Sequence, residues 1–309
     1  MRNAFADEIT EIARQDSSVV LLSGDIGNRL FDKYKESCPN RFINCGVAEA
    51  NMVSMSAGMA LTGMKPVAYT IASFLVYRAF EQIRIDLCYH DAAVLLVGVG
   101  GGLSYSSNGS THHTLEDISL MRSLPNMQVV CAGDPLEVRA AARAYFKHPK
   151  PTYLRIGKKG EPTVHEEVPA DFEIGKSICL KEGDGVAILA TGNLLPLCSK
   201  VSDELDRKGS STSLFSFHTV KPIDEKALLR IFTSHEYVIS VEEHGRQGGF
   251  GSAVMEWLSR QEKPMAKFLS IGTPDAFLLY TGNQESARQT LELDEPGLLR
   301  QINKFLNPS

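Results

Sequence analysis

Short, almost entirely apolar runs alternate with helical patterns along the first half of this chain, and this alternation limits the folds open to it. The runs of strand length occupy residues 18–25, 42–46, 65–70, 92–100, 127–134 and 152–157. The helical patterns between them lie at 48–63, 74–90, 115–123 and 135–147. Strands of a parallel sheet are joined through helices that cover both faces, so these strands are apolar on both sides. The pattern therefore predicts an α/β domain with a mainly parallel sheet flanked by helices.

A polar, irregular segment ends this series, and a second series follows it. Residues 158–172 read KKGEPTVHEEVPADF, and further strand-like runs lie at 185–192, 212–220, 237–243 and 266–272. A chain of 309 residues is long enough to form two hydrophobic cores. We therefore predict one α/β domain at 1–157, a linker at 158–176 and a second α/β domain at 177–309.

Charge and composition exclude several classes of partner. The formal net charge of −5 provides no general attraction to nucleic acid or to an anionic membrane. The longest apolar run, residues 92–103, is too short to span a bilayer and is interrupted by glycines. The six cysteines form no CxxC pair and have no metal-ligand spacing, which is typical of free thiols in a reducing compartment. The N-terminal residues 1–15 are amphipathic and contain acids, unlike a signal peptide. We expect a cytoplasmic protein that binds neither nucleic acid nor membranes.

The glycine clusters do not match the common nucleotide-binding motifs. GVGGGLS at 98–104 follows a predicted strand, but Leu103 occupies the position of the last glycine in GxGxxG. GRQGGFGS at 245–252 is more typical of a tight turn between a strand and a helix. The sequence contains no GxxxxGK[ST] motif and no visible metal-ligand set. A dinucleotide or P-loop function is therefore poorly supported.

One carboxylate, Glu49, stands between an apolar strand and an unusually apolar helix. The segment reads RFINCGVAEANMVSMSAGMAL, residues 41–61, and no other charged residue follows Arg41 within it. An acid at this position can be an N-terminal helix charge that interacts with the helix dipole. It can also be a buried acid with a catalytic role. The residues alone leave both interpretations open.

Five segments resemble transketolases in both order and spacing, and most of all the separately encoded C-terminal subunit of a split transketolase. They are GVAEANM (46–52), FLVYRAFEQIR (74–84), NGSTHHTLEDISLMRSLPNM (108–127), HTVKPID (218–224) and VEEHGRQGGFGSAV (241–254). The resemblance covers nearly the whole chain. It implies a domain that binds the pyrimidine of thiamine diphosphate at 1–157, followed by the C-terminal domain of the family. Deoxyxylulose-phosphate synthase and the beta subunits of 2-oxo-acid dehydrogenases are similar more distantly.

The resemblance implies roles for residues around the cofactor. Glu49 would approach the N1′ nitrogen of the aminopyrimidine and exchange a proton with it. Phe74 and Tyr77 would pack around the pyrimidine ring, although core packing is the commoner explanation for aromatic residues at this spacing. Asp25 and Ile26, in SGDIG, would lie near the thiazolium ring, with turn formation as the alternative.

The resemblance also implies roles for residues that contact the substrate. His112 would hydrogen-bond substrate oxygens and transfer protons, which suits an imidazole. Arg155 and Arg2 would bind a phosphate, with surface salt bridges as the alternative. Asn108 replaces an aspartate that contacts a donor hydroxyl, and Gly100 replaces a histidine. We therefore expect a wider donor channel and a donor other than the usual ketose phosphates.

The family motif that holds diphosphate and magnesium begins with GDG and ends with an asparagine about 30 residues later. This chain has GDG at 183–185, but no asparagine follows at that distance and the GDG opens a predicted strand. We therefore expect a separate N-terminal subunit to bind the diphosphate and Mg²⁺, in an α2β2 heterotetramer that acts on sugars or sugar phosphates. The alternatives are a deoxyxylulose-phosphate-synthase-like enzyme, a 2-oxo-acid dehydrogenase beta subunit, and a non-catalytic regulatory subunit that retains the fold.

Overall fold

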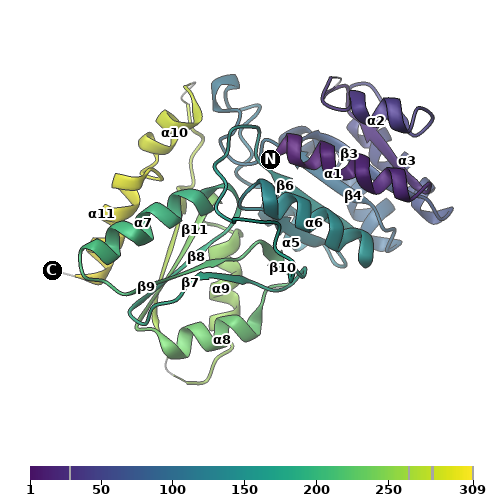
Figure 1. Cartoon of the computed structure of the whole chain (residues 1–309). Coiled ribbons are helices and arrows are strands. Elements are labelled where there is room, and N and C mark those ends of the chain that lie inside the picture. The colour runs from purple at the N-terminus through teal and green to yellow at the C-terminus, as the bar shows by residue number, and fades with distance from the viewer. Residues whose placement is uncertain (28, 264, 280–281, 308–309) are drawn as a thin grey trace.

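The computed structural model describes residues 1–27, 29–263, 265–279 and 282–307 (Figure 1). The elements of its N-terminal half are, in order, α1 (Arg2–Gln15), β1 (Val19–Ser23), α2 (Asp32–Ser37), β2 (Phe42–Asn44), α3 (Glu49–Leu61), β3 (Lys65–Ile71), η1 (Phe74–Arg78), α4 (Phe80–Gln82), η2 (Ile83–Tyr89), β4 (Leu95–Val99), η3 (Ser106–Asn108), α5 (Asp117–Ser123), β5 (Gln128–Cys131), α6 (Pro135–Lys147) and β6 (Thr152–Ile156). Those of its C-terminal half are β7 (Ile178–Lys181), β8 (Val186–Ala190), η4 (Gly192–Leu194), α7 (Leu195–Arg207), β9 (Thr212–Ser216), β10 (Thr219–Lys221), α8 (Glu225–Ser234), β11 (Tyr237–Gly245), α9 (Phe250–Leu258), β12 (Lys267–Thr273), α10 (Gln284–Thr290) and α11 (Glu295–Leu306).

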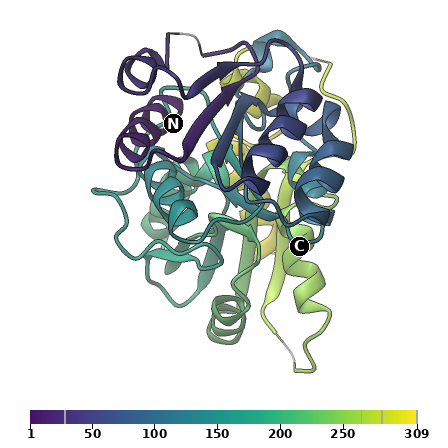
Figure 2. The ribbon, with the colours of Figure 1, turned by 90° about the vertical axis from the view of Figure 1, so that its right-hand side faces the viewer.

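These strands form two sheets. The first has the order β10-β5-β6-β4-β3-β1-β2, and all of its strands are parallel except the edge strand β10. The second has the order β12-β11-β8-β9-β7, with β7 as the antiparallel edge. Figure 2 shows the purple and blue N-terminal segments above the green C-terminal segments. The predicted fold class, two α/β domains with mainly parallel sheets flanked by helices, is confirmed.

Helices cover both faces of each sheet, as the apolar character of the strands requires. On one face of the first sheet, α1 and α6 enclose a cluster that contains Phe5, Ile9 and Val138. On its other face, α3 and the helical segment 74–89 form a cluster with Met52 and Leu75. That cluster continues without a break into the C-terminal half, where the second sheet packs against α8 and α9. The two domains therefore share one of their hydrophobic clusters.

The structure departs from the predicted elements at several places, and the short helix α2 is one that was not predicted. The run at 212–220, predicted as one strand, divides into β9 and β10, which belong to different sheets. The edge strand β7 was not predicted, because it has only four residues and none of them is fully buried. The helix predicted at 74–90 is present but contains two π-helical stretches, η1 and η2. π-Helical turns are often found at functional sites. The strand β10 lies in the C-terminal half of the chain but belongs to the first sheet. The predicted domain boundaries at 157 and 177 therefore stay a prediction.

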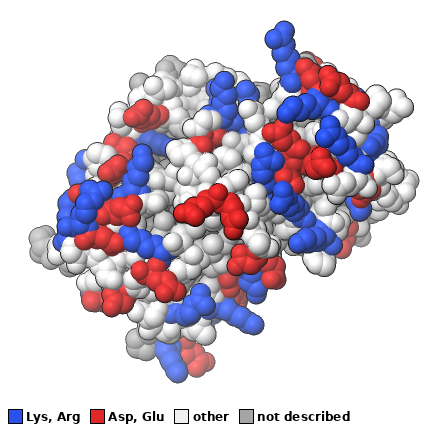
Figure 3. Space-filling view, in the orientation of Figure 1, with Lys and Arg blue, Asp and Glu red and all other residues white. Residues whose placement is uncertain are grey.

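The surface carries charges of both signs. On the face shown in Figure 3, Lys and Arg side chains are interspersed with Asp and Glu. Within the described residues, none of the helices combines the length and the apolar character that crossing a membrane requires. All six cysteines are free thiols.

Candidate active site

The predicted site residues follow the carboxyl ends of parallel strands in the first sheet. Asp25 follows β1, Glu49 follows β2, Phe74 follows β3, and the loop that carries His112 follows β4. In a parallel sheet these ends meet at one edge. The chain also reverses its direction of travel across the sheet between β1 and β3, where α/β proteins bind their ligands. The topology therefore explains why residues far apart in sequence gather here.

Glu49 is buried at the first position of α3, with only 1 % of its surface exposed. Its Oε2 accepts a hydrogen bond from Nη1 of Arg78 at 2.8 Å, and the Arg78 side chain is 52 % exposed. Arg78 was not predicted as a site residue, although it lies in the segment 74–84 that carries Phe74. The helix dipole favours an acid at the first position of α3. Because the Glu49 carboxylate is buried, it also depends on a partner, and that partner lies at the surface.

Three rings connect Glu49 and Arg78 to the loop after β4. The Arg78 guanidinium lies 5.5 Å from the centre of the Phe74 ring, and that ring packs edge-on against His112 at 5.0 Å. His112 in turn contacts Tyr105 with a centroid separation of 6.1 Å. Burial, and secondly the neighbouring His113, lower the pKa of His112, so its imidazole is neutral at pH 7. Glu49, Phe74 and His112 therefore lie along one continuous line of contacts.

The other residues predicted to surround the cofactor are placed less directly. Asp25 has a positive φ of 56° and accepts a hydrogen bond from Asn44 Nδ2 at 2.8 Å. Asn44 Oδ1 then accepts from the backbone N–H of Gly46, in the turn that leads to Glu49. Ile26 is half-buried and packs against the core beside α1. The Tyr77 hydroxyl donates a hydrogen bond to Glu116, so this ring is tied to the segment before α5. No contact of this structure assigns these residues to a cofactor.

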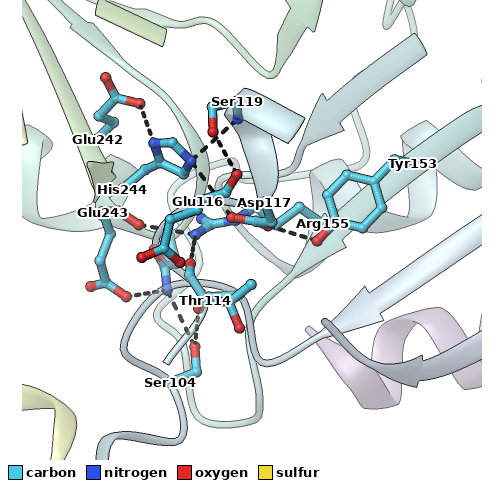
Figure 4. Close-up of polar contacts among 12 residues, drawn as sticks. Ser104, Thr114, Glu116, Asp117, Ser119, Tyr153, Arg155, Glu242, Glu243 and His244 are labelled. Atoms are coloured by element: carbon cyan, nitrogen blue, oxygen red, sulfur yellow. Dashed lines mark hydrogen bonds and ion pairs between the residues drawn. The ribbon is translucent and has the colours of Figure 1, made fainter. Parts of the chain in front are cut away.

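The prediction that Arg155 binds a phosphate does not fit the structure. Its side chain is only 3 % exposed, and its Nε donates to Asp117 Oδ2 at 2.7 Å (Figure 4). Its Nη2 donates to the backbone oxygens of Thr114 and Glu243. Burial acts against the charge, but the Asp117 carboxylate outweighs it and raises the pKa of the Arg155 guanidinium. Arg155 therefore joins the two domains and is not available to an anion from solvent.

A different pair of basic residues lies beside Tyr105. The Nζ of Lys158 is 4.8 Å from the centre of the Tyr105 ring, and the backbone oxygen of Lys158 accepts from the N–H of Arg2 at 3.2 Å. The Nε of Arg2 is buried and has no hydrogen-bond partner. Burial raises the pKa of the Tyr105 phenol, and the charge of Arg2 opposes that rise. Lys158 was not predicted as a site residue, although it follows the apolar end of β6 and could have been considered on that ground.

Gly100, where a wider donor channel was expected, has an aromatic ring beside it. Gly100 has a φ of +81°, and a Cβ atom built on it would lie 2.0 Å from Cε2 of Tyr105. The Tyr105 ring therefore fills the space that a larger side chain at position 100 would need. Asn108 is exposed at the end of the short helix η3, where its Oδ1 accepts a hydrogen bond from Ser107 Oγ at 3.4 Å.

The residues present suit the aminopyrimidine of thiamine diphosphate better than its metal-bound diphosphate. A buried carboxylate beside an aromatic ring matches the needs of an aminopyrimidine, which has polar nitrogens and a flat apolar face. In the described ranges, no three His, Cys, Asp or Glu side chains are grouped so that they could hold a metal ion.

Comparisons with known proteins identify the family. The family model for the pyrimidine-binding domain of transketolase matches residues 1–161, and that for the transketolase C-terminal domain matches residues 175–295. The chain is 32% identical to one of the subunits of the apulose-4-phosphate transketolase of Phocaeicola vulgatus over 306 residues, which is 99% of this chain and 97% of that protein. It is also 32% identical to the SqwH subunit of the 6-deoxy-6-sulfo-D-fructose transketolase of a Clostridium species, over 90% of this chain and 85% of that protein.

Solved structures agree with these relatives. A split-gene transketolase, solved as an inactive beta4 tetramer, superimposes with a TM-score of 0.89 at 31% identity. The match covers 98% of this chain and 97% of the solved chain. The transketolase of Campylobacter jejuni shares the fold, with a TM-score of 0.81 at 17% identity, and this chain covers 46% of it. The chain therefore belongs to the transketolase family and corresponds to the C-terminal, pyrimidine-binding subunit of a split transketolase.

Proposed function

We propose that this chain is the catalytic C-terminal subunit of a two-chain, thiamine-diphosphate-dependent transketolase that transfers a two-carbon ketol unit between sugars or sugar phosphates. The observation that carries the proposal is the buried carboxylate of Glu49 at the carboxyl edge of the first sheet. A buried acid is costly unless it is paired, and the partner of Glu49 is a half-exposed arginine that can be displaced. Such an arrangement keeps the acid ready for a ligand that brings its own nitrogen.

The residues along the line of contacts then have distinct tasks. Glu49 would share a proton with the N1′ nitrogen of the cofactor, and Phe74 would pack against the pyrimidine. When bound, the cofactor supplies the nucleophilic carbon that attacks the donor ketone. His112, neutral at pH 7, can accept a proton from a donor hydroxyl and return it later. Asp25, Ile26 and Tyr77 are proposed to border the same site, on family resemblance alone.

The phosphate of a substrate would be held by Arg2 and Lys158. Both residues lie beside Tyr105, whose ring also contacts His112. The buried Nε of Arg2, which has no partner, is a donor that an anion could satisfy. This assignment replaces Arg155, whose Nε and Nη2 are engaged with Asp117 and with backbone oxygens.

The donor is proposed to be a ketose other than the ordinary ketose phosphates. Asn108 carries no charge where the family aspartate reads a donor hydroxyl, and a site that lacks such a contact discriminates less for that hydroxyl. Tyr105, placed over Gly100, adds an aromatic surface and a hydroxyl group instead. Two similar subunits belong to transketolases for apulose 4-phosphate and 6-deoxy-6-sulfofructose, which are modified sugars.

The partner is proposed to be an N-terminal transketolase subunit that binds the diphosphate and Mg²⁺, in an α2β2 heterotetramer. Neither a complete GDG…Asn motif nor, among the described residues, a metal-ligand cluster is present in this chain. We place the complex in the cytoplasm, where the six free thiols would stay reduced.

A donor panel tests the function. The chain is mixed with an N-terminal subunit encoded beside it, and kcat/KM is measured for xylulose 5-phosphate, apulose 4-phosphate and 6-deoxy-6-sulfofructose with an aldose phosphate acceptor. We expect activity only in the mixture and xylulose 5-phosphate to be the poorest donor. Xylulose 5-phosphate as the best donor would reject the modified-sugar proposal. Decarboxylation of pyruvate without ketol transfer would indicate a deoxyxylulose-phosphate-synthase-like enzyme instead.

A further inference from the structure

The second sheet has a topological switch point of its own, which the proposed function does not use. From β8 the chain passes through α7 to β9 on one side, and it later returns through α8 to β11 on the other side of β8. The connections that leave the carboxyl ends of β8 and β11 therefore diverge. In open α/β sheets, ligands bind in the crevice outside such strand ends.

Part of this crevice is filled by the N-terminal domain, and part is open. The N–H of Leu103 donates to Glu243 Oε1 at 2.7 Å, so the loop after β4 closes one side. The open part, here called the switch-point cavity, has a volume of about 220 Å³. Its walls are residues 159–162, the segment from Asn193 to Lys200 around the start of α7, and Gln284 and Arg288 of α10.

One residue of the cavity lining, Asn193, has a buried acceptor without a partner. Asn193 is 7 % exposed, and its Nδ2 donates to Glu243 Oε1 at 3.1 Å and to Ser104 Oγ at 3.4 Å. These contacts fix the orientation of the amide, yet its Oδ1 is buried and has no hydrogen-bond partner. Leaving a buried acceptor unsatisfied costs free energy, so a hydroxyl or ammonium group would be stabilised here.

The charges around the switch-point cavity favour an anion. Lys159 and Lys200 line it and form no ion pair with any described residue. The Nε of Arg288 is paired with Glu243. Glu161, the carboxylate in the lining, forms an ion pair with the N-terminal ammonium of Met1 at 2.8 Å. The lining therefore contains two lysines that form no ion pair within the described residues, together with Asn193 and its unsatisfied oxygen.

We propose that the switch-point cavity binds a small phosphorylated polyol or sugar, with its phosphate on Lys159 and Lys200 and a hydroxyl on Asn193 Oδ1. The site is connected to the candidate active site through neighbouring residues. Ser104, which Asn193 contacts, precedes Tyr105, and Lys159 follows Lys158. A ligand held here would contact the segment after Lys158 directly and the segment before Tyr105 through Asn193, as expected of an effector site.

The test is calorimetric titration of the full chain with ribose 5-phosphate and with inorganic phosphate. The variant K159E/K200E changes two exposed lysines of the cavity, and K147E/K226E makes the same change in net charge on α6 and α8. We expect ribose 5-phosphate to bind the wild type and K147E/K226E equally, and K159E/K200E at least tenfold more weakly. Inorganic phosphate, which has no sugar hydroxyl, should bind the wild type several-fold more weakly than ribose 5-phosphate.

The variant K158E separates this site from the proposed substrate site. Retention of ribose 5-phosphate binding in K158E, with its loss in K159E/K200E, supports the proposal whatever the fate of the proposed function. Unchanged binding to K159E/K200E, binding lost only in K158E, no binding to the wild type at millimolar concentration, or equal affinity for both probes would each overturn it.

Discussion

At the scale of single residues, the structure separates two kinds of buried charge. Glu49 is buried with a half-exposed partner, whereas Asp117 and Arg155 are both fully enclosed and paired with each other. The first arrangement can open to admit a ligand, because Arg78 can return to solvent. The second cannot open without leaving a charge in the core.

Substituting Glu49 tests its catalytic role. Glu49→Gln keeps the size and the hydrogen-bonding reach but cannot exchange a proton, so we expect activity of the reconstituted enzyme to fall about a hundredfold or more. The free energy of unfolding should change little, because an amide is no harder to bury than a carboxylate. Steady-state kinetics at saturating cofactor measure the effect, and Glu81→Gln is the control, an exposed acid on the same helical segment as Arg78. Normal turnover of Glu49→Gln would show that Glu49 serves only as a charge at the helix N-terminus.

Substituting Asp117 tests the structural role now given to Arg155. Asp117→Asn removes the counter-charge of a guanidinium that is 3 % exposed, and we expect a loss of about 3–5 kcal/mol in the free energy of unfolding. Urea denaturation measures this loss. Glu256→Gln breaks the ion pair with Arg122, in which Glu256 is 63 % exposed, and should cost less than about 1 kcal/mol. Equal costs for the two substitutions would contradict the role of the buried pair.

At the scale of elements, the start of α6 holds the segment between the two domains. Asp134 caps α6 by accepting from the N–H groups of Leu136 and Glu137. Its second oxygen accepts from the N–H groups of Val164 and His165, and the His165 ring lies 2.9 Å from Glu137 Oε1. A single helix N-terminus therefore stabilises both its own first turn and the predicted linker.

This contact should make stability depend on pH. Burial lowers the pKa of His165, but the hydrogen bond and charge of Glu137 outweigh it, so the pKa lies above the usual 6.5. For Glu137, burial raises the pKa, but the hydrogen bond to His165 and other contacts outweigh it and lower the pKa below 4.5. The pair therefore contributes fully between about pH 4.5 and 6.5, and its contribution is lost as the pH rises through the raised pKa of His165.

The measurement compares the free energy of unfolding of the wild type and of His165→Gln from pH 5 to 9. We expect the wild type to be more stable at pH 6 and its advantage to shrink toward pH 9. His148→Gln, at the exposed end of α6, is the control substitution. A difference that stays constant with pH would mean that His165 is not charged in the folded protein.

At the scale of the whole molecule, the two domains are built into each other. The strand β10 from the C-terminal half pairs with β5 in the first sheet, and one apolar cluster passes from the first domain into the second. Arg155 adds polar contacts across the same boundary, to Glu243. The two sheets are therefore separate, whereas the apolar cluster between them is shared by both domains.

A shared core predicts that the domains unfold together. We expect the full chain to show a single thermal transition, with equal calorimetric and van't Hoff enthalpies. A fragment of residues 1–157 lacks β10 and the C-terminal part of the shared cluster, so it should be largely unfolded when expressed alone. Circular dichroism of the fragment is the check, and a cooperative transition near that of the full chain would show that the first domain is independent.

The incomplete cofactor site gives a second prediction at this scale. We expect the chain alone to bind thiamine diphosphate and Mg²⁺ weakly, and the mixture with its N-terminal partner to bind them tightly, because the diphosphate site is proposed to belong to the partner. Calorimetry of each sample measures the difference, and the chain without Mg²⁺ is the control. Tight, Mg²⁺-dependent binding to the isolated chain would exclude the two-subunit proposal.

Much of the fold could be predicted from the sequence, because parallel strands and their covering helices leave periodic apolar patterns in the local sequence. The same local signal placed Glu49 between a strand and an apolar helix, and family resemblance singled out His112 and Phe74. The partners of these residues could not be predicted, since they depend on contacts between distant segments. Only the tertiary structure placed Arg78 on Glu49, filled the space at Gly100 with Tyr105, enclosed Arg155 with Asp117 and moved β10 into the first sheet. Burial and pairing are set by what packs against a residue, and a single stretch of sequence carries little record of that.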